Sequence, residues 1–237
     1  MNNLIKTFAP NTHGRDFVVG DLHGCIDHFE RLLDKIGFEP EKDRMFSVGD
    51  LVDRGPNSMA CLRLLKEPWF YAVLGNHEDM MLDAVSSNLK NGVDQWIMNG
   101  GDWGVEQFED GNPEFFELVD LVDELPITIL VQTKELGTIG ISHAEPPTEW
   151  TEECIERELM HLIWSRKKID APDGSLIKSD VDFSVHGHTI GERITVRDEI
   201  KAFWIDLGCY VNDRLCILQI SGGNITWPKE FLWYGAE

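Results

Sequence analysis

The sequence predicts an α/β fold, and three observations support that prediction. Short apolar runs bounded by polar or glycine-containing segments indicate strands. Three such runs lie in the N-terminal third, at 17–19, 45–48 and 70–74. Apolar residues at helical spacing separate them, in a helix that begins near Cys25 and ends at Gly37 and in a second helix over 59–65. Strand and helix therefore alternate, as in a sheet whose parallel strands are joined by helices.

The remainder of the chain continues this mixture of helices and strands. Residues 77–125 are expected to be mostly helical, with breaks at 99–101 and 111–113, where Gly, Asn and Pro gather. A helix is also expected over 152–166, and a loop over 170–180. Further strand signals occur at 127–133, 138–142, 182–186, 201–206 and 214–220.

Length and composition are those of a soluble globular protein. The 237 residues, 42% of them hydrophobic, suffice for one substantial core, so a single domain over 1–237 is expected. No apolar run approaches the roughly 20 residues of a membrane span, and residues 1–6 lack the apolar segment of a signal peptide. The five cysteines are scattered without a Cys-x-x-Cys pair, which favours a reducing compartment. We therefore expect a cytoplasmic location.

The formal net charge is −21, because Asp and Glu together number 42 and Lys and Arg only 21. Such a surface repels nucleic acid and anionic membranes, so neither is an expected partner. The charge has two interpretations: it keeps the protein in solution, or some of its carboxylates hold cations. Composition alone does not separate them.

Five predicted strands end in small clusters of residues that ligate metals. Taken singly, each cluster is an ordinary turn, but a polar cluster at every one of these strand ends is costly to bury unless it pairs or binds something. Ligands of α/β sheets bind beyond the carboxyl ends of the strands. The clusters are Gly20-Asp21-Leu22-His23-Gly24, Gly49-Asp50-Leu51-Val52-Asp53-Arg54-Gly55, Gly75-Asn76-His77-Glu78, Ser142-His143-Ala144-Glu145 and His186-Gly187-His188-Thr189.

The side chains in these clusters form a chemically coherent ligand set. Carboxylate, imidazole and amide oxygen suit Mn, Fe or Zn, and no thiolate is among them. The ligands are too many for one tetrahedral ion, whereas two ions that share a bridging carboxylate would use them all. Two-metal sites of this kind, with ions about 3.5–4 Å apart, hydrolyse phosphoesters.

The order and spacing of three motifs carry a family resemblance. Gly-Asp-x-His-Gly, Gly-Asp-x-Val-Asp-Arg-Gly and Gly-Asn-His-Glu resemble the phosphoprotein phosphatase family of metallophosphoesterases, above all its small bacterial and bacteriophage members of the lambda type. The likeness covers about residues 15 to 220. It extends to Asp123-Glu124-Leu125-Pro126, Ile163-Trp164-Ser165-Arg166 and Gly187-His188-Thr189.

This resemblance implies a β-sandwich flanked by helices, with the active site at the carboxyl ends of strands. It also implies a metal-dependent phosphomonoester hydrolase, and specifically a protein serine/threonine phosphatase with possible activity on phosphotyrosine or phosphohistidine. Two divalent ions are expected, with Mn favoured and Fe, Zn or Ni possible. The implied ligands are Asp21 and His23 for the first ion, Asp50 for both ions, and Asn76, His143 and His188 for the second.

The resemblance further implies direct attack of a metal-bound hydroxide on phosphorus. Arg54 and Arg166 would hold the phosphoryl oxygens, which suits the paired hydrogen bonds of a guanidinium. His77 would be the general acid, and Asp53 would orient it. For Glu78 we expect a supporting role behind the ligands or at the start of a helix.

One segment departs from the family pattern. Many eukaryotic members carry Gly-Gly after the histidine that matches His143, whereas this chain has Ala144-Glu145-Pro146-Pro147, so the nearby substrate surface is expected to differ. Phosphoproteins or phosphopeptides are the expected substrates. No docking segment for a regulatory subunit is recognisable.

Two alternatives keep the resemblance but change the function. Relatives that hydrolyse dinucleoside tetraphosphates symmetrically typically carry Ala at the position of Asp53, so this chain favours the protein phosphatase. A phosphoprotein-binding module that has lost catalysis is the other alternative. It has no support, because every matched position carries a competent residue.

A third alternative is a cysteine phosphatase, because the stretch from Cys25 to Arg31 satisfies Cys-x₅-Arg. This stretch is expected to be helical, and a phosphate cradle needs a loop of free backbone N–H groups. Cys25 is therefore interpreted as a small apolar residue on the helix.

Three histidines are expected to have no catalytic role. His28 and His161 are expected to be ordinary helix residues, and His186 a structural residue.

Overall fold

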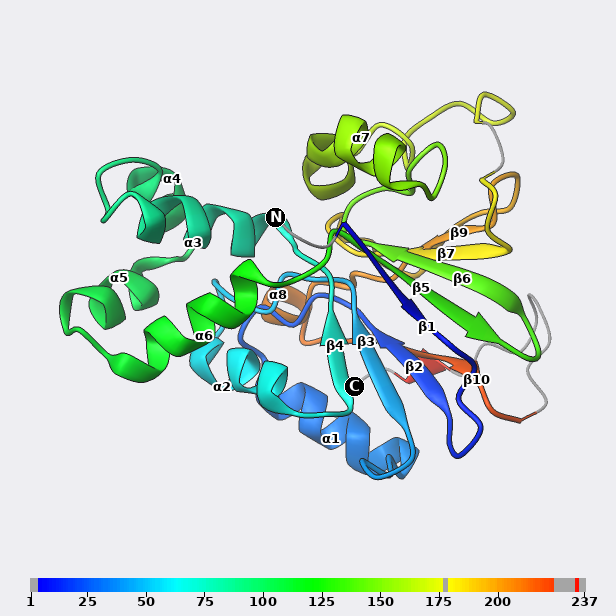
Figure 1. Ribbon diagram of the computed structural model, residues 1–237, viewed down its shortest axis with the longest axis horizontal. Helices are drawn as coiled ribbons and strands as arrows, with labels where there is room; N and C mark the ends of the chain where they lie inside the picture. The colour runs from blue at the N-terminus through cyan, green and yellow to red at the C-terminus, as the bar shows by residue number, and fades with distance from the viewer. Residues whose placement is uncertain (1–3, 177–178, 224–232, 235–237) are drawn as a thin grey trace.

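Two β-sheets packed face to face form the centre of the computed structural model, which describes residues 4–176, 179–223 and 233–234 (Figure 1). In spatial order, the strands of the first sheet are β11 (Trp233–Tyr234), β10 (Ile217–Ser221), β2 (Asp16–Val19), β3 (Arg44–Ser47) and β4 (Phe70–Ala72). Those of the second sheet are β1 (Ile5–Phe8), β5 (Thr128–Thr133), β6 (Gly137–Ser142), β7 (Phe183–His186), β9 (Ala202–Trp204) and β8 (Thr195–Arg197). The predicted α/β fold and the sandwich implied by the resemblance are both confirmed.

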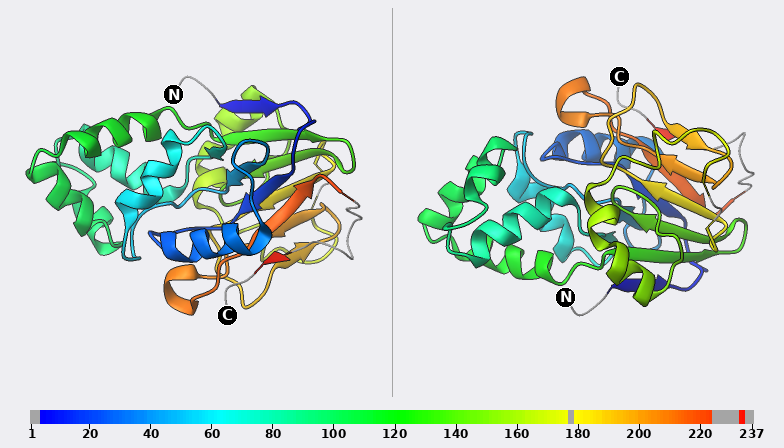
Figure 2. Two further views of the ribbon diagram at one scale, coloured as in Figure 1. Left: turned by 90° about the horizontal axis from the view of Figure 1, so that it is seen from below. Right: turned by 90° about the horizontal axis from the view of Figure 1, so that it is seen from above.

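Helices flank the sandwich in three groups, as the views of Figures 1 and 2 show. The first group lies along the outer face of the first sheet and contains α1 (Ile26–Ile36) and α2 (Ser58–Arg63), which continues as a short 3-10 helix over Leu64–Lys66. The second group forms a helical lobe beside the sheets and contains α3 (Asn76–Ser86), α4 (Val93–Met98), α5 (Asp102–Glu109) and α6 (Pro113–Asp123). The others are α7 (Glu152–Trp164) and the short α8 (Cys209–Asn212).

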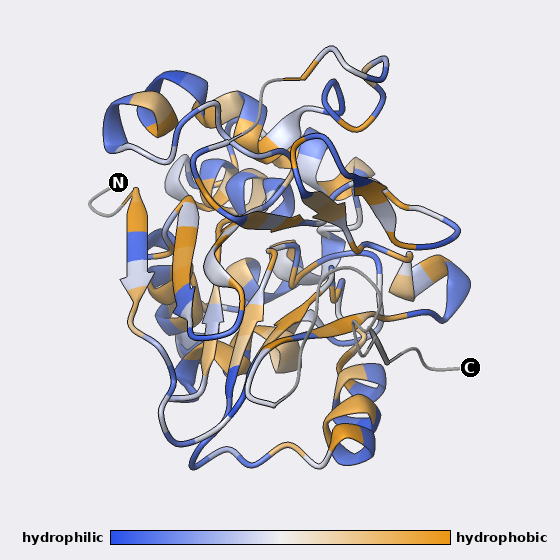
Figure 3. Ribbon diagram, turned by 90° about the vertical axis from the view of Figure 1, so that its right-hand side faces the viewer, coloured by the Kyte–Doolittle hydropathy of each residue, from blue (hydrophilic) through white to orange (hydrophobic). Residues whose placement is uncertain are grey.

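Alternation along the strands separates two layers of core. On β2, Phe17 and Val19 face the helices of the first sheet, whereas Val18 faces the second sheet. Successive side chains of a strand point to opposite faces, so a strand buried on both sides is apolar throughout. Figure 3 shows this pattern, because the strands are mostly hydrophobic while the helices carry both hydrophobic and hydrophilic residues. Among the described residues, no helix is long and apolar enough to cross a bilayer.

Most predicted elements are present, and the differences have local causes. The strand predicted over 70–74 is shorter, because the chain leaves the sheet after Ala72 and the Leu74 N–H donates to the Pro126 carbonyl. The helical stretch has a further, unpredicted break between α3 and α4, where Asn88 and Leu89 adopt positive φ. Residues 177–178 of the predicted loop lie outside the described residues. Four elements that we did not predict, each two to four residues long, are β1, β8, α8 and β11.

Strand direction decides where the polar clusters meet. Strands β2, β3 and β4 are parallel to one another, and β6 is parallel to β7. Their carboxyl ends therefore lie at common edges of the two packed sheets. This arrangement brings together the loops that carry the predicted metal ligands.

Candidate active site

Asp50 lies at the centre of the site, between imidazoles on either side. Its Oδ2 is 3.5 Å from His23 Nε2, and its Oδ1 is 3.3 Å from His143 Nε2. Each imidazole is oriented from behind, because Nδ1 of His23 donates to the Val52 carbonyl and Nδ1 of His143 donates to the Val48 carbonyl, both at 2.8 Å. These bonds leave both Nε2 atoms facing Asp50, which is the orientation that metal-ligating histidines adopt.

Two groups of donor atoms share Asp50. One group is His23, Asp50 and His77, and the other is Asp50, His143 and His188; within each group the donor atoms lie within 4.8 Å of one another. Asn76 joins the second group, because its Oδ1 lies 2.9 Å from His143 Nε2 and 2.8 Å from His188 Nδ1. The shared carboxylate fits the bridging ligand that the resemblance implies.

Asp21 lies at the edge of these groups, and one of its carboxylate oxygens has no hydrogen-bond partner. Its Oδ2 accepts a hydrogen bond of 2.9 Å from the His188 N–H, whereas its buried Oδ1 has no partner. A Cβ on Gly187 would collide with that Oδ1, so only glycine allows this approach. A buried carboxylate oxygen without a hydrogen bond is costly unless a cation neutralises it.

The electrostatics of the site also fit divalent cations. Burial raises the pKa of Asp21 well above its usual value, and the neighbouring Asp206 and Asp50 carboxylates add to the effect. Burial lowers the pKa of His23 and of His188 to about 3, so both imidazoles are neutral and keep a lone pair for a metal. The carboxylates of Asp21, Asp50 and Asp206 repel one another, and two divalent ions would offset that repulsion.

Asp50 and His143 hold a proton that a metal would displace. Burial opposes ionisation of Asp50, but the imidazoles of His143 and His77 hold its pKa well below the usual range. Burial likewise opposes protonation of His143, yet the Asp50 carboxylate beside it raises the His143 pKa to about 9. Metal binding at this pair is therefore expected to release a proton.

His77 and Asp53 form a buried pair beside the ligand groups. His77 Nδ1 lies 2.7 Å from Asp53 Oδ2, while His77 Nε2 is buried without a partner. The same carboxylate accepts two indole N–H groups, with Trp103 Nε1 at 2.8 Å and Trp96 Nε1 at 3.1 Å from Oδ1. Burial raises the pKa of Asp53, and the hydrogen bonds from His77 and both tryptophans oppose that rise. Neither tryptophan is predicted from the sequence, since nothing in the local pattern of α4 and α5 points to Asp53.

The two predicted arginines lie at the exposed mouth of the site. Arg54 Nη1 donates to the Tyr210 hydroxyl at 3.1 Å, and the guanidinium stacks over the Tyr210 ring with its centre 5.0 Å from the centroid. Tyr210 also packs edge-on against His23, and sequence reasoning missed it. Arg166 is held more loosely, through Nη2 and the His188 carbonyl at 3.4 Å. Both guanidiniums therefore remain available to an anionic ligand.

The backbone at the site is strained. Five of the residues assigned to the site adopt positive φ, a region that side chains other than glycine rarely enter. They are His23 (42°), Asp50 (52°), Asp53 (71°), Arg54 (69°) and His188 (68°). Such conformations cost on the order of 1–3 kcal/mol each and persist where the surrounding structure enforces them. At these positions, a side chain that is predicted to be functional adopts a backbone conformation that favours glycine.

Glu78 supports the loop that carries Asp50. Its Oε2 accepts from the N–H groups of Asp50 (2.8 Å) and Gly75 (3.0 Å), and its Oε1 accepts from Leu51 (2.8 Å) and Val52 (3.3 Å). Glu78 therefore closes the start of α3, one of the two alternatives expected for it, and fixes the loop that carries the predicted ligand Asp50. Burial and the Asp50 carboxylate raise its pKa to about 7.

Replacing Glu78 with Gln is expected to destabilise the protein and to weaken metal binding. Both carboxylate oxygens accept two N–H groups each, so an amide NH₂ placed at either position faces donors. The loss should be about 1.5–3 kcal/mol in the free energy of unfolding, the range for hydrogen bonds to a charged group. Urea unfolding measures it, with the exposed Glu109→Gln as a control on a neighbouring helix. Equal stability of the two variants would contradict this role.

The segment that departs from the family pattern is buried. The Ala144 N–H donates to the Leu162 carbonyl, and the Ala144 carbonyl accepts from Trp204 Nε1. Glu145 is 2% exposed and accepts from the Lys168 N–H. The segment thus anchors the loop after α7 to the second sheet. The residues that directly follow the segment, 148–149, are the ones exposed to solvent.

His186 has the structural role expected for it. Its Nδ1 lies 3.0 Å from Ser142 Oγ and its Nε2 lies 2.8 Å from Ser184 Oγ, within the second sheet. Burial lowers its pKa to about 3. Both ring nitrogens are therefore used inside the core.

Comparisons with known proteins agree with this geometry. The calcineurin-like phosphoesterase family model matches residues 17–192. A protein of Salmonella typhimurium named serine/threonine-protein phosphatase 1 is 35% identical over 204 residues, covering 86% of this chain and 91% of that protein. A symmetrical bis(5'-nucleosyl)-tetraphosphatase of Dechloromonas aromatica is 38% identical over 137 residues, covering 57% of this chain and 45% of that protein.

A solved structure shows the same fold. It is described as a putative diadenosine tetraphosphatase, covers 99% of both chains with a TM-score of 0.70, and is 23% identical to this chain. At that identity the likeness concerns the fold alone. The extent of the family match, together with the ligand groups that share Asp50, shows that this chain belongs to the calcineurin-like phosphoesterase family and is a metallophosphoesterase related to bacterial serine/threonine protein phosphatases.

Proposed function

We propose that this protein is a protein phosphatase that hydrolyses phosphoserine and phosphothreonine, with phosphotyrosine and phosphohistidine as further candidate substrates. The observation that carries the proposal is the buried Asp53–His77 pair, whose carboxylate is held by Trp96 and Trp103. Esters of serine and threonine leave as strongly basic alkoxides, so their hydrolysis benefits most from a positioned proton donor.

The metal ligands on this proposal are Asp21, His23, Asp50, Asn76, His143 and His188. Two divalent ions, for which Mn is the expected metal, would neutralise the charge of a phosphate ester and activate water for attack. The chain itself orients two of these ligands, through the carbonyls of Val52 and Val48 behind His23 and His143.

Arg54 and Arg166 would bind the phosphoryl oxygens. A guanidinium donates parallel hydrogen bonds to a phosphate, and Arg54 is held in place by Tyr210. Both arginines are exposed, so the phosphate of a large substrate can reach them. This placement supports a phosphoprotein or phosphopeptide as substrate.

His77 would give its proton to the leaving oxygen from Nε2, which is buried without a partner in the protein. The hydrogen bond to the Asp53 carboxylate keeps a proton on Nδ1 and orients the imidazole. Because Trp96 and Trp103 fill the remaining acceptor positions of Asp53, the carboxylate cannot turn away from His77.

Symmetrical hydrolysis of dinucleoside tetraphosphates is the second candidate function. The relative from Dechloromonas aromatica carries a name with that activity. A nucleotide polyphosphate leaving group is less basic than an alkoxide and needs the Asp53–His77 pair less. The three hydrogen-bonded partners of Asp53 therefore favour the protein phosphatase.

A hydrolysis panel tests the proposal. Purified protein is assayed with phosphoserine, phosphothreonine, phosphotyrosine and phosphohistidine peptides and with diadenosine tetraphosphate, each with Mn, Ni, Zn or Mg. We expect kcat/KM to be highest for a phosphoserine or phosphothreonine peptide with Mn. A higher value for diadenosine tetraphosphate would support the second candidate, and no turnover of any substrate would point to a binding module.

Replacing Arg54 with Ala is expected to slow phosphoserine peptides and p-nitrophenyl phosphate by similar factors. The guanidinium contacts the phosphoryl group, which both substrates share, and not the leaving group. Loss of a charge-assisted, paired hydrogen bond should cost about 1.5–3 kcal/mol, which is on the order of 10–100-fold in kcat/KM. Arg63→Ala, which breaks only an exposed ion pair to Glu114, is the control. A loss confined to one substrate would contradict the assignment.

For cellular location we propose the cytoplasm. All five cysteines are free thiols and all are buried, which is typical of proteins kept in a reducing compartment. Fractionation of cells that produce the protein tests this.

A further inference from the structure

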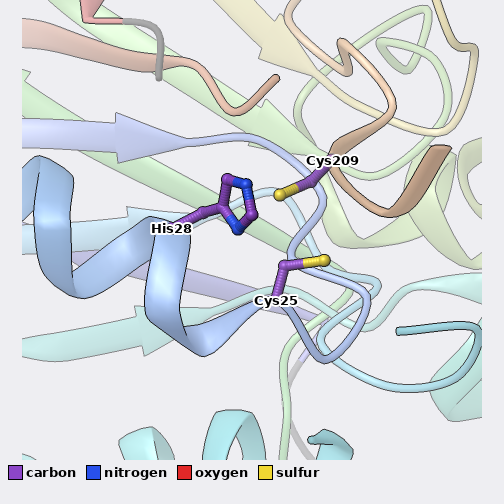
Figure 4. Close-up of side chains that lie close together, drawn as sticks. All are labelled: Cys25, His28 and Cys209. Atoms are coloured by element: carbon purple, nitrogen blue, oxygen red, sulfur yellow. The ribbon is translucent and has the colours of Figure 1, made fainter. Parts of the chain in front are cut away.

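Three donor atoms of a different kind converge outside the active site. Cys25 immediately precedes α1, His28 lies in the first turn of α1, and Cys209 begins α8. Figure 4 shows both sulfurs and the His28 ring directed toward the same space between these segments. The two sulfurs and a ring nitrogen lie within 4.8 Å of one another. Among the described residues, no other such group contains a cysteine.

The spacing suits a tetrahedral ion. Zinc–sulfur bonds of about 2.3 Å and zinc–nitrogen bonds of about 2.0–2.1 Å place tetrahedral ligand atoms roughly 3.5–3.8 Å apart. From a largest separation of 4.8 Å, the three donors would therefore need to approach one another by at most roughly 1.0–1.3 Å. Thiolate ligands select thiophilic ions, whereas the carboxylates and amide of the active site suit Mn or Mg.

A carboxylate beside the imidazole and an entry path are present. Asp213 Oδ1 lies 3.6 Å from His28 Nε2, and its side chain is 90% exposed. His28 is also partly exposed, at 19%, while both cysteines are buried. An ion can therefore reach the thiols from the solvent side, and Asp213 can close the site behind it.

Packing alone accounts for part of this arrangement. A buried cysteine is common in protein cores, and that explanation covers Cys25 or Cys209 taken singly. It does not account for a half-buried imidazole turned toward both sulfurs with a carboxylate beside it. Two thiols and an imidazole around one space are three of the four ligands of a structural zinc site, and the carboxylate of Asp213 lies beside the imidazole.

We propose that Cys25, His28 and Cys209 bind one thiophilic cation of the Zn²⁺ class, with Asp213 as the fourth ligand. This ion is additional to the two of the active site. It would join the start of α1 to α8.

The neighbours of this site give the ion a structural consequence. His23 lies two residues before Cys25, and Tyr210 directly follows Cys209. The Tyr210 ring packs against His23 with ring centroids 5.0 Å apart, and its hydroxyl accepts from Arg54. A cation that joins the two segments therefore stabilises the contact between Tyr210 and the mouth of the active site.

The experiment is a Co²⁺ titration of the full chain preloaded with Mn²⁺, in a phosphine reductant that keeps all thiols reduced. Thiolate ligation of Co²⁺ produces a sulfur-to-cobalt charge-transfer band in the near ultraviolet, which imidazole and carboxylate ligands do not produce. We expect the band to saturate at one Co²⁺ per chain. We expect Cys25→Ser and Cys209→Ser to lose it and the control Cys154→Ser to keep it.

Two further measurements distinguish a variant that has lost the metal site from a variant that has not folded. Zn²⁺ should raise the melting temperature of the Mn²⁺-loaded wild type and of Cys154→Ser but not of Cys209→Ser, because only an ion bound to the native state stabilises it. The Cys25→Ser variant should keep its Mn²⁺-dependent turnover, which shows that it is folded and that no thiol takes part in hydrolysis. His28→Gln, on the helix surface, provides a second variant if a serine substitution prevents folding.

An absent charge-transfer band in reduced wild-type protein would overturn the proposal. So would an undiminished band in the Cys25→Ser and Cys209→Ser variants, because it would place the thiolate ligand elsewhere. Complete loss of turnover in well-folded Cys25→Ser would instead assign the thiol to the hydrolytic reaction. None of these outcomes depends on which phosphoester is the substrate.

Discussion

Replacing His77 with Asn is expected to slow phosphoserine-peptide hydrolysis by roughly 10²–10⁴-fold, the range for general acid–base catalysis. The serine alkoxide is strongly basic and needs a proton as its bond to phosphorus breaks. The leaving group of p-nitrophenyl phosphate is much less basic and departs with little help. The same variant should therefore slow p-nitrophenyl phosphate far less. The structure supports this expectation, since Nε2 of His77 has no hydrogen-bond partner in the protein and lies 4.0 Å from Asp50 Oδ2, at the predicted metal ligands.

The measurement compares kcat/KM for the two substrates in matched variants. Asp53→Asn should show the same selectivity in milder form, because Asp53 acts through His77 Nδ1. Trp103→Phe removes one hydrogen bond to Asp53, so the difference between its losses on the two substrates should be smaller still. Metal content is measured in every variant, because His77 lies close to Asp50. Equal losses on both substrates for His77→Asn, at unchanged metal content, would refute the general-acid role.

Replacing Asp50 with Asn is expected to be the most damaging single change among the predicted ligands. The two oxygens of Asp50 face His23 and His143 on opposite sides, so one residue serves both groups of donors. Asn keeps the shape but turns one acceptor into a donor and removes the charge. Changes to residues that only support metal ligands cost up to about 100-fold. Asp50 is itself a predicted ligand, so we expect kcat/KM to fall by more than that. Metal bound after dialysis should fall with it.

Metal removal by a chelator tests the same centre in the wild type. Activity should disappear on chelation and return on addition of Mn, with two ions bound per chain at the active site. Asp21→Asn is the comparison for Asp50→Asn, because Asp21 is implied for one ion only and should affect metal content less. Full activity in metal-stripped protein would contradict the two-metal interpretation. A larger effect for Asp21→Asn than for Asp50→Asn would place the bridge elsewhere.

The thiophilic site and the active site are expected to prefer different metal ions. The active site offers carboxylates, imidazoles and an amide, whereas the second site offers thiolates. Excess Zn²⁺ should therefore fill the Cys25, His28 and Cys209 site before it displaces Mn²⁺ from the active site. The Cys209→Ser variant should lack Zn²⁺ at the Cys25, His28 and Cys209 site, so its metal content gives the occupancy of the active site alone.

Local pattern was sufficient to predict much of this protein. Strands such as β2 and β3 are short, contain the apolar residues Phe17–Val19 and Met45–Phe46, and are followed by Gly20 and Gly49, so apolar runs and turn residues locate them. The polar residues directly after these strands include the six predicted ligands. Their convergence follows from the rule that parallel strands end at a common edge. The edge strand β1, with its sequence Ile-Lys-Thr-Phe, carries too little pattern to be recognised.

Only the tertiary structure decided which side chains support the ligands. Trp96 and Trp103 reach Asp53 from 43 and 50 residues away, and Tyr210 reaches Arg54 from 156 residues away. Cys209 meets Cys25 only because α8 packs beside the start of α1. A sequence pattern records the φ preferences and the polarity of neighbouring residues. A hydrogen bond between distant segments depends instead on how sheets and helices pack, and that packing is a property of the whole chain.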